Sequence, residues 1–316
     1  MPAKIFNKGA YPTMITPYCA DGSVDYATAE KYVQWYYDKG CNGIFSVCQS
    51  SEIAFLTLDE RVKLNKTVYD AAQRINAKDP GALTVVSSGH VETEIDKQIY
   101  ELNRIIESGT DALILITNRF DPNNEGDDVW LRNAEAVLKG LPEDIKLGLY
   151  ECPAPYKRLV NPRILQWCVD TGRFAYMKDT CCDIDLIRER LDVLRGSDFL
   201  LFNANCQTLL ASMRAGAAGY CGILGNFHPQ LYRWLCDNYE TQPEKADRVQ
   251  ALLGSLGSTE GGLPYPLSAK YHMCLEGIPT ENIARNRDSA ELTEYMKDCT
   301  RQLKLLTDTA AAQLGI

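Results

Sequence analysis

Short apolar runs and amphipathic stretches alternate along most of the chain. The apolar runs, which are typical of buried parallel strands, fall at 11–16, 43–47, 83–86, 112–116, 146–150, 175–180, 199–202 and 219–222. Between them, apolar residues recur at the three- and four-residue spacing of a helix face, and most of these stretches end at a glycine. Asp25 is a candidate helix cap, and Thr57 with Glu60 forms a capping box. Eight strand-then-helix units predict a closed (β/α)8 TIM barrel.

The chain divides into two parts by this pattern. A doubly wound open sheet is the main alternative for the first part, but the glycine-rich phosphate loop expected after its first strand is missing. From about Phe227 the pattern becomes purely helical, and a last amphipathic stretch covers about 290–314. The intervening 254–267, rich in glycine, serine and proline, is predicted to be a loop. We therefore expect a barrel over 1–226 and a C-terminal helical extension over 227–316.

Composition narrows the class of protein. The net charge of −9 argues against nucleic acid or an anionic membrane surface as partner. No apolar run approaches the roughly 20 residues of a membrane span, and the first residues lack a signal-peptide core. Twelve cysteines without a CxxC pair indicate a reducing, cytoplasmic compartment, and three histidines far apart argue against a metal site.

Lys178 is the first candidate for chemistry. It follows an apolar run and stands where the sixth predicted strand leaves the core. An amine half wrapped in apolar side chains loses stabilisation of its charged form and becomes nucleophilic, as a Schiff-base lysine must be. The alternative is a lysine that only extends to the surface at a strand end.

Other candidates stand at the C-terminal ends of predicted strands, where barrels of this kind carry their reacting groups. Ser50 and Ser51, with the amides of their turn, could cradle a carboxylate, or could form an ordinary polar turn. Tyr150 could relay a proton or be a half-buried core residue. Cysteines also lie near these strand ends, at positions 48, 152, 181, 182, 206 and 221. We expect their side chains to line the site as small apolar groups rather than to act as redox groups.

Several short motifs, in the same order and spacing, give the chain a family resemblance. They lie at 13–17, 21–25, 40–43, 48–52, 150–153, 177–180 and 216–219. Together they resemble the pyruvate-dependent class I aldolases of the dihydrodipicolinate synthase and N-acetylneuraminate lyase family. The resemblance covers about residues 8–230 and extends into the helical C-terminal part.

The resemblance implies a mechanism without a cofactor other than the lysine imine itself. Lys178 would attack the ketone of a small 2-oxo acid such as pyruvate, and the resulting iminium ion would stabilise the neighbouring carbanion. Tyr150 would shuttle the proton, and Ser50, with Ser51, would hold the carboxylate. The backbone carbonyl of Cys221 would accept a hydrogen bond from the tyrosine or the substrate. The family also suggests a homo-oligomer, a tetramer built as a dimer of dimers or a dimer.

Departures from the family pattern indicate a divergent member rather than a true dihydrodipicolinate synthase. Gln49 stands where the family carries a relay hydroxyl, and an amide cannot pass a proton in the same way. Arg119 and Phe120 replace a tyrosine pair, one member of which is lent across the subunit interface. Arg119 would meet a second carboxylate or a hydroxyl chain, or be an exposed loop arginine. Glu151 replaces an asparagine and would add an acid–base group.

Three functional hypotheses follow. The first is a Schiff-base aldolase or lyase that makes or breaks a C–C bond next to pyruvate through Lys178. The second is a 2-oxo-3-deoxy sugar acid dehydratase with the same iminium chemistry. The third is a non-catalytic 2-oxo acid binding protein, which Gln49 favours and the presence of both Lys178 and Tyr150 disfavours.

Overall fold

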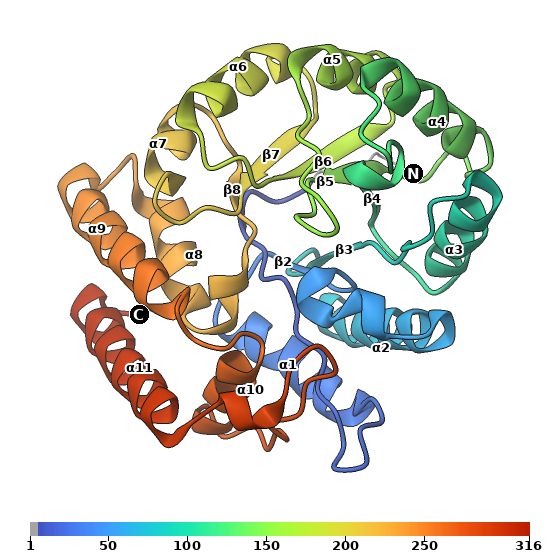
Figure 1. Cartoon of the computed structure of the whole chain (residues 1–316). Coiled ribbons are helices and arrows are strands. Elements are labelled where there is room, and N and C mark those ends of the chain that lie inside the picture. The colour runs from blue at the N-terminus through green and yellow to red at the C-terminus, as the bar shows by residue number, and fades with distance from the viewer. Residues whose placement is uncertain (1–5) are drawn as a thin grey trace.

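A ring of parallel strands surrounded by helices forms the main body of the molecule (Figure 1). The computed structural model describes residues 6–316; residues 1–5, on which the signal-peptide prediction partly rests, lie outside it. The strands are β1 (Gly9–Ala10), β2 (Gly43–Phe45), β3 (Thr84–Ser87), β4 (Ala112–Ile116), β5 (Leu147–Tyr150), β6 (Phe174–Asp179), β7 (Leu200–Asn203) and β8 (Gly219–Tyr220).

The sheet closes on itself. Its order runs β1-β8-β7-β6-β5-β4-β3-β2, with all neighbours parallel. Between β2 and the segment after β1, Met14 N donates to Phe45 O at 2.9 Å, Phe45 N donates to Pro12 O at 2.9 Å, and Thr13 bridges Phe45. The prediction of a (β/α)8 barrel is confirmed.

The bounds predicted for the first strand were wrong. We expected a strand over 11–16, but β1 covers only Gly9–Ala10, and the rest of the segment makes a single bridge at Thr13. Pro12 and Pro17 lack the backbone N–H that a regular ladder needs, so the apolar pattern there continues beyond the strand.

A helix follows every strand in chain order. These helices are α1 (Tyr26–Asp38), α2 (Leu58–Asn76), α3 (Ile95–Glu107), α4 (Asp127–Lys139), α5 (Pro162–Asp170), α6 (Ile184–Leu194), α7 (Leu209–Arg214) and α8 (Pro229–Asn238). The predicted caps are confirmed: the Asp25 carboxylate accepts a hydrogen bond from Thr28 N, and Thr57 and Glu60 form a capping box. Local sequence signals therefore fix where the first helices begin.

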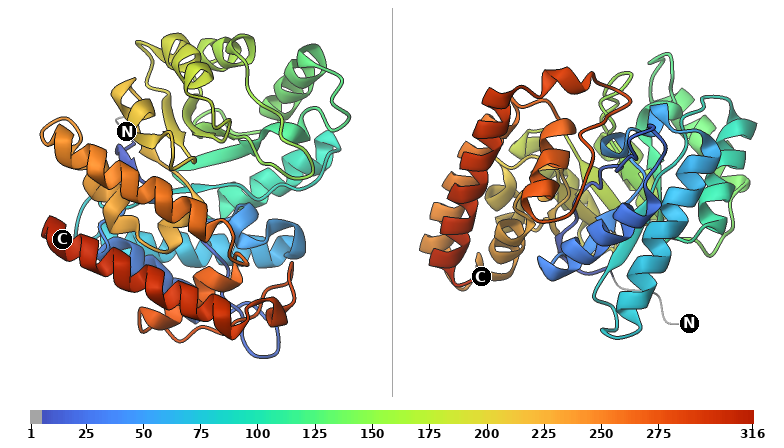
Figure 2. Two further views of the ribbon diagram at one scale, coloured as in Figure 1. Left: turned by 60° about the vertical axis from the view of Figure 1, so that its left-hand side comes forward. Right: turned by 90° about the horizontal axis from the view of Figure 1, so that it is seen from below.

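Three further helices lie along one side of the barrel: α9 (Pro243–Glu260), α10 (Leu267–Leu275) and α11 (Glu294–Leu314). Figure 2 shows α9 and α11 running beside each other, and α10 packs on α11. Helix α8 packs against β1 and β8, in the place of the barrel's eighth helix. The boundary predicted at 226 assigns α8 to the extension; the division of the chain into 1–226 and 227–316 stays a prediction.

The loop predicted at 254–267 was wrong over its first half, because α9 continues to Glu260. The loop was predicted partly from the glycines of this stretch, which here lie inside a helix. A Cβ atom at Gly257 would lie 2.2 Å from Cys206 Sγ, so this glycine serves close packing of α9 on the barrel rather than a turn.

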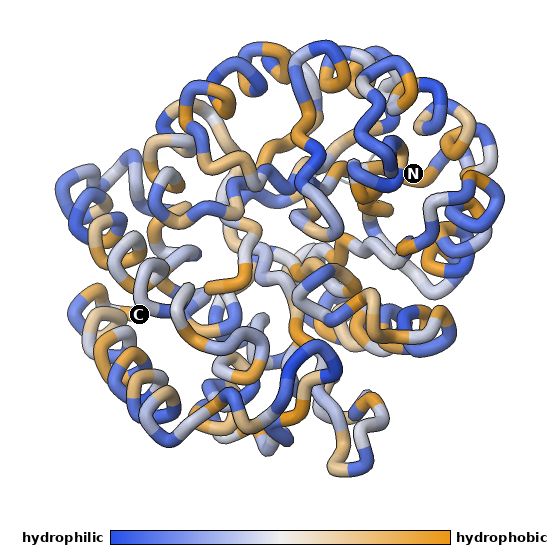
Figure 3. The backbone as a smooth tube through the Cα atoms, in the orientation of Figure 1, coloured by the Kyte–Doolittle hydropathy of each residue, from blue (hydrophilic) through white to orange (hydrophobic). Residues whose placement is uncertain are grey.

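Hydrophobic residues concentrate in the strands and on the inward helix faces (Figure 3). At the centre, the rings of Tyr176 and Phe202 stack with centroids 4.5 Å apart, and Tyr11 packs on both. None of the helices within residues 6–316 combines the length and apolar character needed to cross a bilayer.

Candidate active site

Lys178 and Tyr150 lie side by side at the C-terminal end of the barrel. They are direct partners in the register of β5 and β6. Lys178 Nζ lies 4.2 Å from the centroid of the Tyr150 ring and 5.6 Å from that of Phe45. Lys178 and Tyr150 are each only 3% exposed. The amine therefore lies against two aromatic rings and away from bulk solvent.

Thiols surround this pair. Burial raises the pKa of Tyr150 well above its ordinary value, and the neighbouring Cys152 and Cys48 side chains act in the same direction. Burial raises the pKa of Cys221 to about 11, against the attraction of Lys178. All three cysteines are buried. Because burial also raises the pKa of Cys152, Cys152 and Cys221 are thiols beside the amine rather than thiolates.

The turn after β2 brings the two predicted serines to the same end of the barrel but gives them different surroundings. Ser51 Oγ donates to Met14 O at 2.6 Å and accepts from Cys48 N at 3.2 Å, so it is occupied in holding the turn. Ser50 Oγ donates to Thr13 Oγ1 at 2.9 Å. Ser50 and Thr13 also interact with the buried Tyr265 side chain, and because neither hydroxyl holds the turn as Ser51 does, they are the better carboxylate-binding pair.

Glu52 ties this turn to the C-terminal helices. The residue has a left-handed backbone, with φ 61°, and its carboxylate lies 2.8 Å from Lys270 Nζ in α10. It also accepts the backbone N–H groups of Arg285 and Asn286. Burial lowers the pKa of Lys270 to about 8, although Glu52 acts in the opposite direction. The extension thus holds the candidate carboxylate-binding turn in place.

Gln49 lies at the opening of the barrel, in the turn after β2. Its side chain is exposed, and its Oε1 accepts a hydrogen bond from Cys152 Sγ at 3.1 Å. Gln49 therefore contacts the loop that follows Tyr150 at the end of β5.

Glu151 points away from Lys178 into a fully buried ion-pair network. Its carboxylate accepts from Val160 N at 2.8 Å and Thr180 N at 2.9 Å, and it pairs with Arg190, which also pairs with Asp179. Burial raises the pKa of Glu151, against the attraction of Arg190. Because side chains alternate along a strand, Tyr150 and Glu151 face opposite sides of the barrel wall.

Arg119, in the turn η3 (Thr117–Arg119), is partly buried at the same end of the barrel. Burial lowers its pKa, while the charges of Cys152 and Glu101 act in the opposite direction. Within residues 6–316 no carboxylate pairs with Arg119, and its buried Nε has no hydrogen-bond partner. Glu101 instead pairs with Arg61 at 2.7 Å.

Cys221 directly follows β8, and its backbone N donates to Asn203 O at 3.0 Å. The role predicted for its carbonyl stays a prediction. Sequence reasoning missed Thr13, Cys152 and Lys270 as partners in the site. Thr13 and Cys152 stand in the motifs at 13–17 and 150–153, whereas nothing in the sequence points to Lys270.

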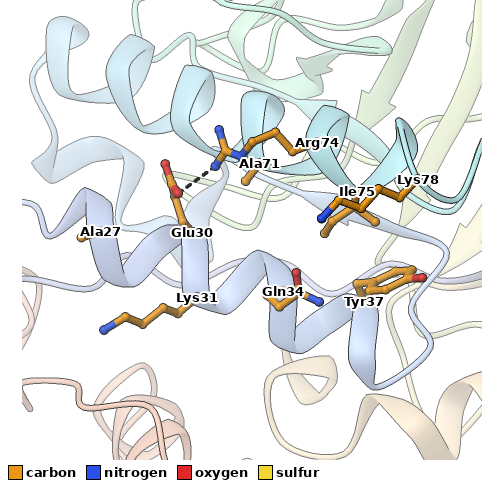
Figure 4. Close-up of a pocket in the computed structure, with 9 residues that line it drawn as sticks. All are labelled: Ala27, Glu30, Lys31, Gln34, Tyr37, Ala71, Arg74, Ile75 and Lys78. Carbon is orange, nitrogen blue, oxygen red and sulfur yellow. Dashed lines mark ion pairs between the residues drawn. The ribbon is translucent and has the colours of Figure 1, made fainter.

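The described residues offer no metal centre, and the surface hollow between the first two helices lies apart from the candidate site. No group of three or more histidine, cysteine, aspartate or glutamate side chains in the described part of the chain could hold a metal ion. A hollow between α1 and α2 (Figure 4) lies on the outer helices, where Arg74 pairs with Glu30 at 2.7 Å. None of the candidate site residues lines it.

Known proteins resemble the chain in both sequence and fold. The model of the dihydrodipicolinate synthetase family matches residues 7–78. The 4-hydroxy-tetrahydrodipicolinate synthase of Shewanella baltica is 26% identical over 231 residues, covering 72% of this chain and 74% of the relative. That of Coxiella burnetii is 24% identical over 268 residues, covering 82% and 86%.

Solved structures match almost the whole fold. A monomeric dihydrodipicolinate synthase variant superposes with a TM-score of 0.84 at 18% identity, over 96% of this chain and 98% of the other. A prophage protein of the dihydrodipicolinic acid synthase family from E. coli K12, in complex with pyruvate, gives 0.81 at 20% identity, over 96% and 98%. With the family match over residues 7–78 and the sequence relatives, they confirm that the chain resembles the dihydrodipicolinate synthetase family, at the low identity of a divergent relative.

Proposed function

We propose that this protein is a Schiff-base-forming class I aldolase or lyase that reversibly makes or breaks a C–C bond next to pyruvate. The observation that carries the proposal is the buried Lys178 amine, 4.2 Å from the Tyr150 ring at the C-terminal end of the barrel. The sequence relatives named as synthases and the structural neighbour that holds pyruvate support the same class of reaction.

The residues suggest a division of labour. The neutral amine of Lys178 attacks the ketone carbon, and the carbonyl oxygen leaves as water once it has gained two protons. The iminium ion then accepts the electron pair released when a C–C or C–H bond at the next carbon breaks. Because the raised pKa of Tyr150 keeps its hydroxyl protonated near neutral pH, it can donate a proton to the departing oxygen.

The substrate carboxylate would bind at the turn after β2. The donors that the turn offers are the Ser50 and Thr13 hydroxyls and the Gln49 and Ser50 backbone amides in η1 (Gln49–Ser51), since the Ser51 amide already donates to Cys48 O. Fixing the carboxylate there orients the ketone towards Lys178, and such positioning can contribute several kcal/mol of barrier reduction.

The surroundings of Arg119 favour a substrate whose second part is acidic or carries several hydroxyl groups. Its guanidinium lacks an ion-pair partner within residues 6–316, and it interacts electrostatically with Cys152 beside Tyr150. A carboxylate or a chain of hydroxyls would satisfy its donors. This feature also favours the second candidate, a 2-oxo-3-deoxy sugar acid dehydratase that uses the same imine.

Trapping with sodium borohydride tests the proposal. Incubation with pyruvate and borohydride should add one carboxyethyl group to the protein, which peptide mapping should locate on Lys178. Lys178→Met should abolish the adduct, whereas Lys157→Met, an exposed lysine nearby, should not change it. If neither pyruvate nor longer 2-oxo acids gave an adduct on the folded protein, the proposal would be wrong and a binding protein would be favoured.

Assembly, location and cofactor use are further parts of the proposal. We expect a homotetramer or a dimer, measurable by light scattering, in a cytoplasmic setting. Phe120 is fully buried and packs on Trp130 of its own chain with ring centroids 5.1 Å apart, which supports an interface without an exchanged aromatic.

We also propose that activity needs no cofactor, so that it should persist after dialysis against a chelator.

A further inference from the structure

The site contains a buried phenol without the hydroxyl that would connect it to solvent. Tyr150 is only 3% exposed, and the side chain opposite it at the mouth is the Gln49 amide. An amide oxygen accepts a hydrogen bond but does not take up and release a proton at neutral pH. A tyrosine that donates a proton in each turnover must recover it from another group.

Cys152 lies where such a group is needed. Its backbone N donates to Tyr150 O at 2.9 Å, so the chain turns back immediately after the strand. The thiol is 4% exposed and donates to Gln49 Oε1 at 3.1 Å. The thiol and the Tyr150 hydroxyl are also near enough for each to shift the pKa of the other. Phenol, thiol and exposed amide therefore form a continuous path from Lys178 towards solvent.

Resting on the proposed function, we infer that Cys152 is the proton-relay residue that serves Tyr150, with Gln49 orienting its thiol. In this step Tyr150 gives its proton to the departing oxygen, and the Cys152 thiol reprotonates the phenolate. The thiolate then takes a proton from water at the mouth. No electron is transferred, and Gln49 only accepts a hydrogen bond throughout.

The surrounding charges suit this role. Burial raises the pKa of Cys152, so that the resting group is a thiol able to donate. Lys178 acts in the opposite direction and would stabilise the transient thiolate, particularly as an iminium cation. The other groups that face this part of the site are the Cys48 thiol and the Arg119 guanidinium.

The rate at which the pyruvate methyl protons exchange with deuterium, followed by NMR, tests the relay, because every exchange event needs the imine to form and then to hydrolyse. Prolonged borohydride trapping reports only whether the imine can form at all. Cys152→Ala should still give the borohydride adduct on Lys178 but should slow exchange by roughly tenfold to a hundredfold, since acid–base catalysis contributes about 10²–10⁴ in total. Cys152→Ser should recover most of the rate, with a changed pH profile. Adding Gln49→Thr to Cys152→Ala should also restore exchange, because a hydroxyl returns to the mouth.

Cys168→Ala is the matched control, because this thiol is fully buried in α5 away from the barrel mouth; exchange should be unchanged. The relay is overturned if Cys152→Ala keeps exchange within twofold of the wild type. It is equally overturned if Cys152→Ser and the Gln49→Thr double variant are as slow as Cys152→Ala. A missing adduct in the wild-type protein would instead contradict the proposed function itself.

Discussion

Glu151 can be neutralised with a nearly isosteric change, Glu151→Gln, and the outcome distinguishes two roles for this residue. As an acid–base group near the substrate, it would affect turnover. The structure instead buries it completely, where it pairs with Arg190 and accepts the backbone N–H groups of Val160 and Thr180. We therefore predict a large loss of stability.

The magnitude follows from what the glutamine would leave unpaired. Its one carbonyl oxygen can serve only one of the two backbone N–H groups, and Arg190 loses a counter-charge while it keeps Asp179. Removing one partner from a buried ion pair costs about 3–5 kcal/mol. Because Asp179 remains, we expect the lower end, about 3–4 kcal/mol, which at roughly 2 °C per kcal/mol for a chain of this size lowers Tm by about 6–8 °C.

Differential scanning calorimetry and kcat measured well below Tm are the two assays. Glu189→Gln, the same chemical change at an exposed position of α6, is the control and should stay within about 0.5 kcal/mol of the wild type. The reasoning is refuted if Glu151→Gln melts with the wild type yet loses turnover, because the carboxylate would then act on the substrate.

Three further outcomes are expected. Burial lowers the pKa of His90 to about 3, from about 6.5 in the unfolded chain. The stability that the neutral imidazole contributes is therefore complete above about pH 6.5 and is lost as the pH falls below that value. That loss is about 2 kcal/mol at pH 5, and a flatter acid limb of unfolding in His90→Gln would confirm it. Lys270→Met should cost about 3–5 kcal/mol in urea unfolding, because Glu52 stays buried without its partner; a change below 1 kcal/mol would contradict this. Arg119→Gln should lower kcat/KM for an acidic second substrate roughly tenfold to a hundredfold, with a clearly smaller change for a neutral one; equal losses would argue against the contact.

The barrel was predictable because its signals are local. Each strand is a short apolar run, and helices begin at caps such as Thr57 and Glu60, so order and type of the elements follow from neighbouring residues. Lys178 and Tyr150 could be paired in advance because strands five and six are adjacent in any such barrel.

Contacts between distant residues could not be predicted. Glu52 and Lys270 are 218 positions apart, and no periodicity connects them. Glu151 shows a different difficulty. Strand alternation alone places it opposite to Tyr150, but its partner Arg190 lies on α6, where an arginine usually faces solvent. Gly257 likewise resembled a loop residue, because close packing against Cys206 leaves no trace in the sequence.

The attachment of Glu52 to Lys270, Arg285 and Asn286 has a consequence for how this protein can be altered. The turn that would receive the substrate carboxylate is partly built by the last fifth of the chain. A chimera that exchanged the C-terminal helices for those of one of the similar synthases would have to include matching donors for Glu52. Otherwise the turn would lose its shape even though every residue in the barrel was retained.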